Sequence, residues 1–268
     1  MARRETWDSM RHWDLVLPPS RPSNFQLSKI RYQIQGFGRD APVGILGSTP
    51  EFRDLLYEMG FENVTILERN CDFYNACSGL RVYSNSESIL WGDWMETLSK
   101  CEDQFQIVLS DLTSGNIHYN ERSAFYGLIE NSLRKGGIFI DKLLTHPGPN
   151  MSLQLIIDKY SELPLNLQFI NYFSCEAIFC SELLDETQEI DTDVFYLSLK
   201  ECSANRRFQA FVERAKMITP EGCKWYYGVP WDELSANYCP RLRKLWELDE
   251  EPWSPYAGRL KYVCHINP

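Results

Sequence analysis

Acidic residues stand just after three of the four short apolar segments in the middle of the sequence. These acids are Glu68, Asp93 and Asp111. Carboxylates at such positions can accept hydrogen bonds from the hydroxyl and amino groups of a ligand. The remaining segment leads into Gly47-Ser48-Thr49-Pro50, and Glu68 lies 21 residues after Gly47. That distance is close to the roughly 20-residue spacing typical of a carboxylate that binds ribose hydroxyls.

The Gly47 turn lacks the residues that phosphate-binding loops need. A loop for nucleoside triphosphates presents Gly-Lys-Ser/Thr at a helix start, and no lysine occurs in the turns after the four segments. The stretch Gly44-Ile45-Leu46-Gly47 matches the dinucleotide pattern GxGxxG poorly, and Pro50 and Phe52 leave little room for a pyrophosphate. The pattern therefore favours a ligand with a ribose and an adenine but no phosphate.

The other two acids can serve the same ligand. We expect Asp93 to accept a hydrogen bond from the adenine amino group, with Trp94 or Trp91 stacked nearby. We expect Asp111 to attract a cationic amino acid tail. A plainer interpretation exists for each acid, because Asp93 can cap a short helix and Glu68 or Asp111 can be an ordinary loop or turn residue.

A parallel sheet is needed to bring these residues together. Residues 41–146 alternate short apolar strands with amphipathic helices, which is typical of a doubly wound sheet covered on both faces. Ligands of such sheets bind beyond the carboxyl ends of the strands, where the turn and the acids would lie. Strands are predicted at 43–46, 64–67, 88–91, 105–109 and 138–140, and helices at 51–59, 72–78 and 121–134.

The flanking regions are less regular than the middle of the chain. We predict an N-terminal helical lid at residues 1–40, a core at 41–146, and a third region at 147–268 that adds sheet strands and a substrate-side helical cap. Within the flanks, helices are predicted at 24–35, 152–162 and 205–217, and strands at "LQFINYF" (167–173) and "RLKYVCHI" (259–266).

The composition disfavours several classes of partner. The 268 residues carry a formal net charge of -10 and a sequence pI of about 5.0, which repels phosphate backbones, so we expect no nucleic acid partner. The nine cysteines form no CxxC pair or zinc-ligand spacing, so we expect no metal. No stretch approaches the roughly 20 apolar residues of a membrane span, and residues 1–14 lack the apolar run of a signal peptide. We therefore expect a reduced cytoplasmic protein.

Residues 41–146 resemble the class I S-adenosylmethionine-dependent methyltransferases. The stretches "VGILGSTPEF", "VTILERN", "ILWGDWMETL", "FQIVLSDLTSGN" and "LRKGGIFIDK" stand in the order of that family's nucleoside loop, ribose acid, adenine acid, fourth-strand motif and final strand. The resemblance implies a mostly parallel, seven-stranded Rossmann-like sheet with S-adenosyl-L-methionine as the cofactor. It implies cofactor-binding roles for Gly47, Ser48, Thr49, Glu68, Asp93, Trp94, Ser110 and Asp111.

The implied reaction is methyl transfer to N, O or C of a small-molecule acceptor. Such an enzyme mainly positions a nucleophile and excludes water, so it needs neither a catalytic triad nor a metal site. His118, Tyr119 and His146 follow the fourth and fifth strands and are candidates for a general base. Two alternatives stay open: a catalytically silent binding or scaffold subunit, favoured by the reduced glycine loop and by Val43 where the family has an acid, and an enzyme that transfers the cofactor's aminocarboxypropyl group.

Overall fold

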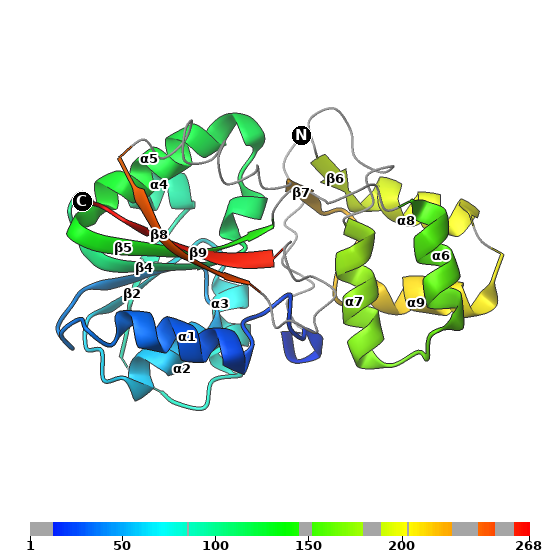
Figure 1. Cartoon of the computed structure of the whole chain (residues 1–268), viewed down its shortest axis with the longest axis horizontal. Helices are drawn as coiled ribbons and strands as arrows, with labels where there is room; N and C mark the ends of the chain where they lie inside the picture. The colour runs from blue at the N-terminus through cyan, green and yellow to red at the C-terminus, as the bar shows by residue number, and fades with distance from the viewer. Residues whose placement is uncertain are drawn as a thin grey trace. The chain divides into compact units, whose positions relative to one another are not determined.

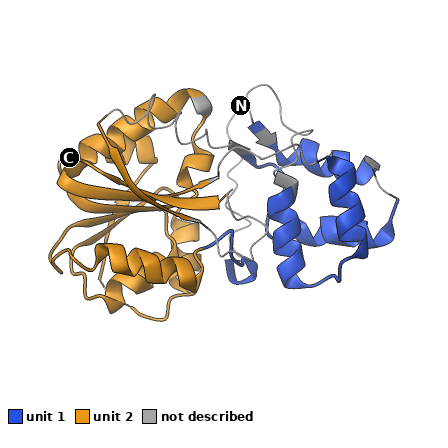
Figure 2. Cartoon of the chain, viewed as in Figure 1, with its two compact units in different colours: residues 1–21, 146–227 blue, residues 22–145, 228–268 orange. Residues whose placement is uncertain are grey.

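A computed structural model describes most of the chain. The described residues are 13–84, 86–144, 152–178, 189–202, 204–226, 241–249 and 260–268. They form two compact units, one from residues 1–21 and 146–227 and a larger one from 22–145 and 228–268 (Figure 2). The predicted site residues before residue 145 all fall in the larger unit.

The larger unit is built on a seven-stranded sheet. Its strand order is β3-β2-β1-β4-β5-β9-β8. Strands β1 to β5 are parallel, whereas β9 runs antiparallel to both of its neighbours. This topology confirms the predicted doubly wound, mostly parallel sheet. The strands are β1 (Val43–Leu46), β2 (Val64–Glu68), β3 (Ser88–Trp91), β4 (Phe105–Asp111), β5 (Leu133–Leu144), β8 (Arg243–Asp249) and β9 (Leu260–Ile266).

Helices cover both faces of the sheet, and each face has its own apolar core (Figure 1). On one face lie α1 (Asn24–Ile34), α2 (Pro50–Glu58) and α3 (Cys71–Ser78), and on the other lie α4 (Trp94–Leu98) and α5 (Arg122–Ser132). The buried residues of α2 recur at the helical spacing that the sequence predicts, and Gly60 with φ +79° follows the helix end. Two short 3-10 turns, η2 (Thr113–Asn116) and η3 (Tyr119–Glu121), follow β4.

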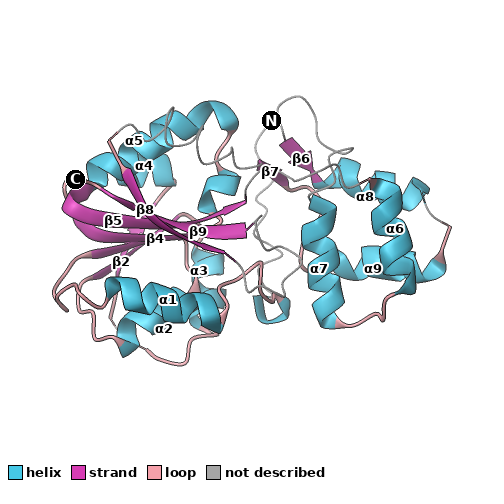
Figure 3. Cartoon of the chain, in the orientation of Figure 1, coloured by secondary structure: helices cyan, strands magenta, loops and turns pink. Residues whose placement is uncertain are grey.

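The smaller unit consists mainly of helices (Figure 3). They pack around an aromatic core. Its core includes Tyr160, Phe173, Phe208 and Phe211, whose rings meet at steep angles. Such edge-to-face contacts favour aromatic packing beyond simple burial. The elements are α6 (Leu153–Glu162), α7 (Leu167–Ile178), α8 (Thr192–Cys202), α9 (Arg206–Ala215) and a two-stranded sheet of β6 (Glu189–Asp191) and β7 (Lys224–Tyr226).

The N-terminal forty residues contribute to both units. Helix α1 buries Ile30 and Ile34 in the core of the larger unit. The segment before it belongs to the smaller unit, where Asn171 of α7 accepts a hydrogen bond from the amide of Leu17 (2.9 Å) and donates one to the carbonyl of Leu15 (3.1 Å). The roles of these segments as a lid and of the helical unit as a cap stay predictions.

The strand predicted at residues 167–173 is wrong, because this segment forms the first part of α7. Its buried residues include Ile170, Phe173 and Ser174, which are spaced as one face of a helix. Asn166 starts the helix, since its side chain accepts a hydrogen bond from the amide of Phe169 at 2.9 Å. The β-favouring aromatic residues in this segment are outweighed by that cap and by packing against α6 and α9.

Candidate functional site

The turn after β1 is closed by backbone geometry that only glycine adopts easily. Gly47 has φ +85°, and its amide donates a hydrogen bond to the carbonyl of Leu67 (2.9 Å). Thr49 is the N-cap residue of α2, and Pro50 occupies the first position of the helix. Ser48 and Thr49 are both buried. The turn therefore presents the amino-terminal end of α2 at the carboxyl edge of the sheet.

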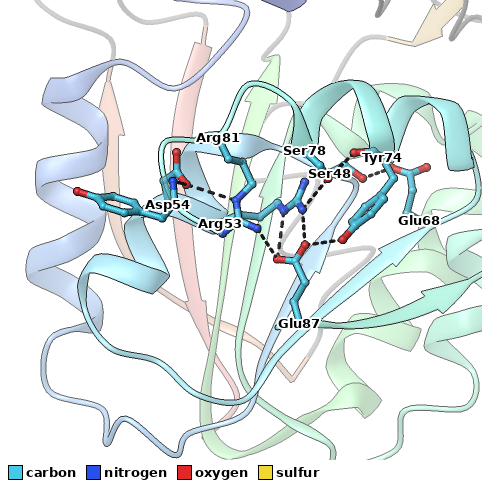
Figure 4. Close-up of polar contacts among 9 residues, drawn as sticks. Ser48, Arg53, Asp54, Glu68, Tyr74, Ser78, Arg81 and Glu87 are labelled. Carbon is cyan, nitrogen blue, oxygen red and sulfur yellow. Dashed lines mark hydrogen bonds and ion pairs between the residues drawn. The ribbon is translucent and has the colours of Figure 1, made fainter. Parts of the chain in front are cut away.

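Glu68 ends β2 and meets this turn directly (Figure 4). Its Oε2 accepts a hydrogen bond from the Ser48 hydroxyl at 2.8 Å, and its Oε1 accepts from the amides of Arg69 (2.8 Å) and Asn70 (2.9 Å). Burial raises the pKa of Glu68, and the amide of Asn70, the Ser48 hydroxyl and the amide and charge of Arg69 oppose that rise. The structure thus brings two predicted site residues, Ser48 and Glu68, into contact.

Asp93 and Trp94 follow β3 and have clear structural roles. The Asp93 carboxylate accepts a hydrogen bond from the amide of Met95 (3.0 Å), so it caps α4, and it lies 3.5 Å from the guanidinium of Arg69. The indole of Trp94 is buried in the core and donates to the carbonyl of Leu67 at 2.9 Å. Trp91, by contrast, is 48% exposed. The adenine roles of Asp93 and Trp94 stay predictions.

Asp111 ends β4 and is engaged by two residues that the sequence did not single out. Its Oδ1 accepts a hydrogen bond from the phenol of Tyr262 (2.8 Å) and lies 3.7 Å from the Nζ of Lys142. These residues are neighbours in the sheet, since Asp111 pairs with Lys142 and Lys142 pairs with Tyr262. The Lys142 side chain is fully buried and lies over the Tyr262 ring. The sequence offers one sign of this cluster, since Lys142 is a charged residue within a largely apolar segment.

Ser110 and Asp141 lie side by side on the opposite face of the same two strands. Both side chains are fully buried. Burial raises the pKa of Asp141 to about 7, against the influence of the nearby Ser110, Ser114 and Tyr126 hydroxyls. The carboxyl group of Asp141 is therefore partly protonated near neutral pH.

The three candidates for a general base are the least defined part of the site. The Nδ1 atom of His118 accepts a hydrogen bond from the amide of Asn120 at 3.2 Å. Tyr119 begins η3, and His146 lies outside the described residues. Among the residues described, no cluster of three or more His, Cys, Asp or Glu side chains could hold a metal, and no helix is both long and apolar enough to cross a membrane. The general base stays a prediction.

No protein-family model and no curated protein matches the sequence. A solved structure described as a putative Zn-dependent alcohol dehydrogenase from Rhodobacter sphaeroides is 13% identical, with a TM-score of 0.62 and coverage of 100% of this chain and 99% of that chain. The N-methyltransferase NodS from Bradyrhizobium japonicum, crystallised with S-adenosylhomocysteine, is 10% identical, with a TM-score of 0.52 and coverage of 98% of each chain.

A third similar structure also contains S-adenosylhomocysteine. It is the 1,6-didemethyltoxoflavin-N1-methyltransferase from Burkholderia thailandensis, which is 12% identical, with a TM-score of 0.50 and coverage of 98% of this chain and 81% of that chain. At these identities the similarity shows the fold alone. The larger unit has a mostly parallel, seven-stranded Rossmann-like sheet, and the methyltransferase NodS is similar to the chain in fold.

Proposed function

We propose that the protein binds S-adenosyl-L-methionine and catalyses methyl transfer to N, O or C of a small-molecule acceptor. The observation that carries this proposal is the buried Glu68 carboxylate beside the Gly47 turn at the carboxyl edge of the sheet. Similar folds that contain S-adenosylhomocysteine support the same ligand. The choice of a small-molecule acceptor rests on the net charge of -10 and on the predicted N-terminal lid.

The residues at this edge suit a ligand with a ribose. A carboxylate offers about four lone-pair positions. In Glu68, hydrogen bonds from Ser48, Arg69 and Asn70 occupy three of them, which leaves capacity on Oε2. A ribose hydroxyl can donate to that oxygen or replace the Ser48 hydroxyl. The turn contains no lysine that would neutralise a phosphate, so the donor set fits a nucleoside better than a nucleotide.

The protein then has mainly to bind the cofactor and the acceptor and to orient them toward each other. Bound S-adenosyl-L-methionine supplies an electrophilic methyl group. Glu68 and the Gly47 turn would hold its nucleoside, and Asp93 would face the adenine amino group. Holding the acceptor in line with the methyl carbon and excluding water lower the barrier without a covalent intermediate. A proton lost by the acceptor requires a base, for which His118, Tyr119 and His146 remain the candidates.

The test of this proposal follows the fate of the methyl group. The protein is incubated with methyl-labelled S-adenosyl-L-methionine and a metabolite extract, and the products are analysed by mass spectrometry. Methyl transfer places the label in a new product and leaves an unlabelled thioether. Label retained in the thioether by-product would show aminocarboxypropyl transfer instead, and the methyl-transfer proposal would be wrong.

A binding or scaffold subunit is the second candidate function. It is favoured by the internal pairing of Asp111 with Lys142 and by the packing of Trp94 in the core, which reduce the number of polar groups available to a ligand. Thermal unfolding with S-adenosyl-L-methionine and with S-adenosylhomocysteine separates the candidates. At a ligand concentration 100 times the dissociation constant, an active enzyme gains about 2.7 kcal/mol of stability against unfolding. A scaffold whose pocket is filled by its own side chains gains none.

A nicotinamide-dependent dehydrogenase is disfavoured by the sheet itself. The dinucleotide-binding Rossmann sheet has the order 3-2-1-4-5-6 with parallel strands. Here the antiparallel β9 stands between β5 and β8. If Gly47 is taken as the first glycine of GxGxxG, Thr49 replaces the second glycine, which lets a pyrophosphate approach, and Phe52 replaces the third, which allows close packing of helix on strand.

A further inference from the structure

A buried ionic network lies behind the turns that carry the predicted nucleoside contacts (Figure 4). At its centre Arg53 of α2 donates two hydrogen bonds to Glu87, one of them from Nε at 3.2 Å, and both side chains are almost fully buried. Arg53 also donates to the hydroxyl of Ser78 (2.8 Å). A paired, bidentate arginine of this kind fixes both distance and orientation between the elements it joins.

The same pair holds helix α3 through Tyr74. The phenol of Tyr74 donates to Glu87 at 2.8 Å, and the Arg53 guanidinium lies 4.6 Å from the centre of the Tyr74 ring. The Tyr74 ring in turn meets the half-exposed ring of Trp91 edge to face, with centroids 5.6 Å apart. Arg53 is thereby connected to the last residue of β3, which stands directly before Gly92 and Asp93.

A second arginine extends the network into the segment before β3. Arg81 lies 3.2 Å from Glu87 and 3.3 Å from Asp54, and it is also nearly buried. Asp54 accepts hydrogen bonds from the amides of Val82 (2.8 Å) and Tyr83 (3.3 Å). Glu87 is therefore held from both sides immediately before Ser88, where β3 begins.

Each element joined by this network begins or ends at a turn of the candidate site. Helix α2 starts at the Gly47 turn, α3 starts directly after Asn70, and β3 leads to Asp93. A network needed only for stability could join these elements anywhere. This network joins them close to the turns at residues 47–49, 69–71 and 91–93, within one or two helical turns of each. These three turns must be arranged together to surround a nucleoside.

We propose that the Arg53–Glu87 pair is a positioning element that holds the turns at residues 47–49, 69–71 and 91–93 in one arrangement and so sets the affinity for the nucleoside half of the ligand. The identity of that ligand rests on the proposed function, whereas the coupling among the turns does not. Preorganised turns avoid the cost of ordering when the ligand binds, so loosening them weakens binding without removing any contact.

The test compares R53M with wild type, R53K and a matched control, E130Q. The control neutralises the buried Glu130 carboxylate of α5 in its ion pair with Arg241, so it too breaks an ion pair that contains a buried charge, but outside the network. Hydrogen exchange is measured first, without ligand. We expect amides of all three turns to exchange about tenfold faster together in R53M, to change less in R53K, and to stay unchanged in E130Q. Faster exchange confined to α2, or the same pattern in E130Q, would overturn the proposal.

Binding is measured next, by calorimetry with S-adenosylhomocysteine and methylthioadenosine. These probes share the nucleoside and differ in the amino acid tail. We expect R53M to lower the affinity for both probes by the same factor, roughly tenfold, and E130Q to leave both affinities unchanged. Loss of affinity for S-adenosylhomocysteine alone would contradict a role at the nucleoside. If wild type binds neither probe, the proposed function fails, and the exchange pattern still decides whether the three turns are coupled.

Discussion

Glu68 is the last residue of β2 and Asp111 the last residue of β4, so both lie at the carboxyl edge of the sheet. Their carboxylates nevertheless have different partners. Glu68 accepts hydrogen bonds from one hydroxyl and two backbone amides, all of them neutral donors. Asp111 is matched by the Lys142 ammonium and the Tyr262 phenol. A carboxylate held by neutral donors keeps some accepting capacity for a ligand. A carboxylate paired with a buried cation is largely committed to the fold.

This contrast separates a nucleoside edge, formed by Ser48, Glu68 and Asp93, from a β4–β5 edge, formed by Asp111, Asp141, Lys142 and Tyr262. On the nucleoside edge, substitutions should change ligand affinity more than stability. On the β4–β5 edge, they should change stability more than affinity.

The largest effect is expected for Lys142→Met. The substitution keeps much of the buried stem but leaves the Asp111 carboxylate without its cation, and breaking a buried pair in this way costs about 3–5 kcal/mol. Denaturant unfolding measures the loss. The double variant K142M/D111N should recover most of it, because no charge is then left unpaired. Equal stability of K142M and wild type would show that the ion pair does not hold the β4–β5 edge.

The next effect is a pH dependence that arises from Asp141. Its folded pKa of about 7 lies above the ordinary value of 3.8, so the folded state binds the proton more tightly than the unfolded state. Stability therefore falls as pH rises from about 4 to about 7, by an amount on the order of a few kcal/mol. Asp141→Asn should remove this fall and make the protein more stable than wild type at pH 8. Parallel pH profiles for the two proteins, from thermal unfolding, would contradict the assignment.

The sequence predicts where the residues of the nucleoside edge lie in the fold because its signals are local. Gly47, Glu68 and Asp93 each stand beside a short apolar strand, and their order along the chain fixes their order at the sheet edge. The cluster of Lys142 and Tyr262 could not be predicted in the same way. It depends on the antiparallel pairing of β5 with β9, which come from distant parts of the chain.

The same limit applies to the Arg53–Glu87 pair. Arg53 looks like an ordinary polar residue of an amphipathic helix, and Glu87 lies in a polar segment before a strand. Only the folded structure shows that both side chains are buried against each other. Local patterns thus predict which residues stand at the sheet edge, whereas the partners of buried charges are decided by tertiary contacts.

On the nucleoside edge, Glu68→Gln should change affinity while the fold persists. The amide keeps the shape but removes the charge, and a hydrogen bond to a charged group contributes about 1.5–3 kcal/mol. Calorimetry with S-adenosylhomocysteine should therefore show a dissociation constant that is roughly ten- to hundredfold larger. Glu62→Gln, at an exposed position just before β2, serves as the control and should bind like wild type. Unchanged affinity in E68Q would refute the ribose assignment.

The smallest effect is expected at Asp93, where cap and ligand roles can be separated. Asp93→Ala removes the cap of α4 and should cost about 1 kcal/mol of stability. Asp93→Ser keeps a good N-cap but shortens the side chain, so its stability should stay near that of wild type. The ion pair with Arg69 is partly exposed and contributes little to either comparison. If Asp93 also binds adenine, both variants should bind methylthioadenosine several-fold more weakly, consistent with one lost hydrogen bond of about 1 kcal/mol. Wild-type affinity in D93S would restrict Asp93 to the cap and leave Glu68 as the carboxylate that defines the nucleoside edge.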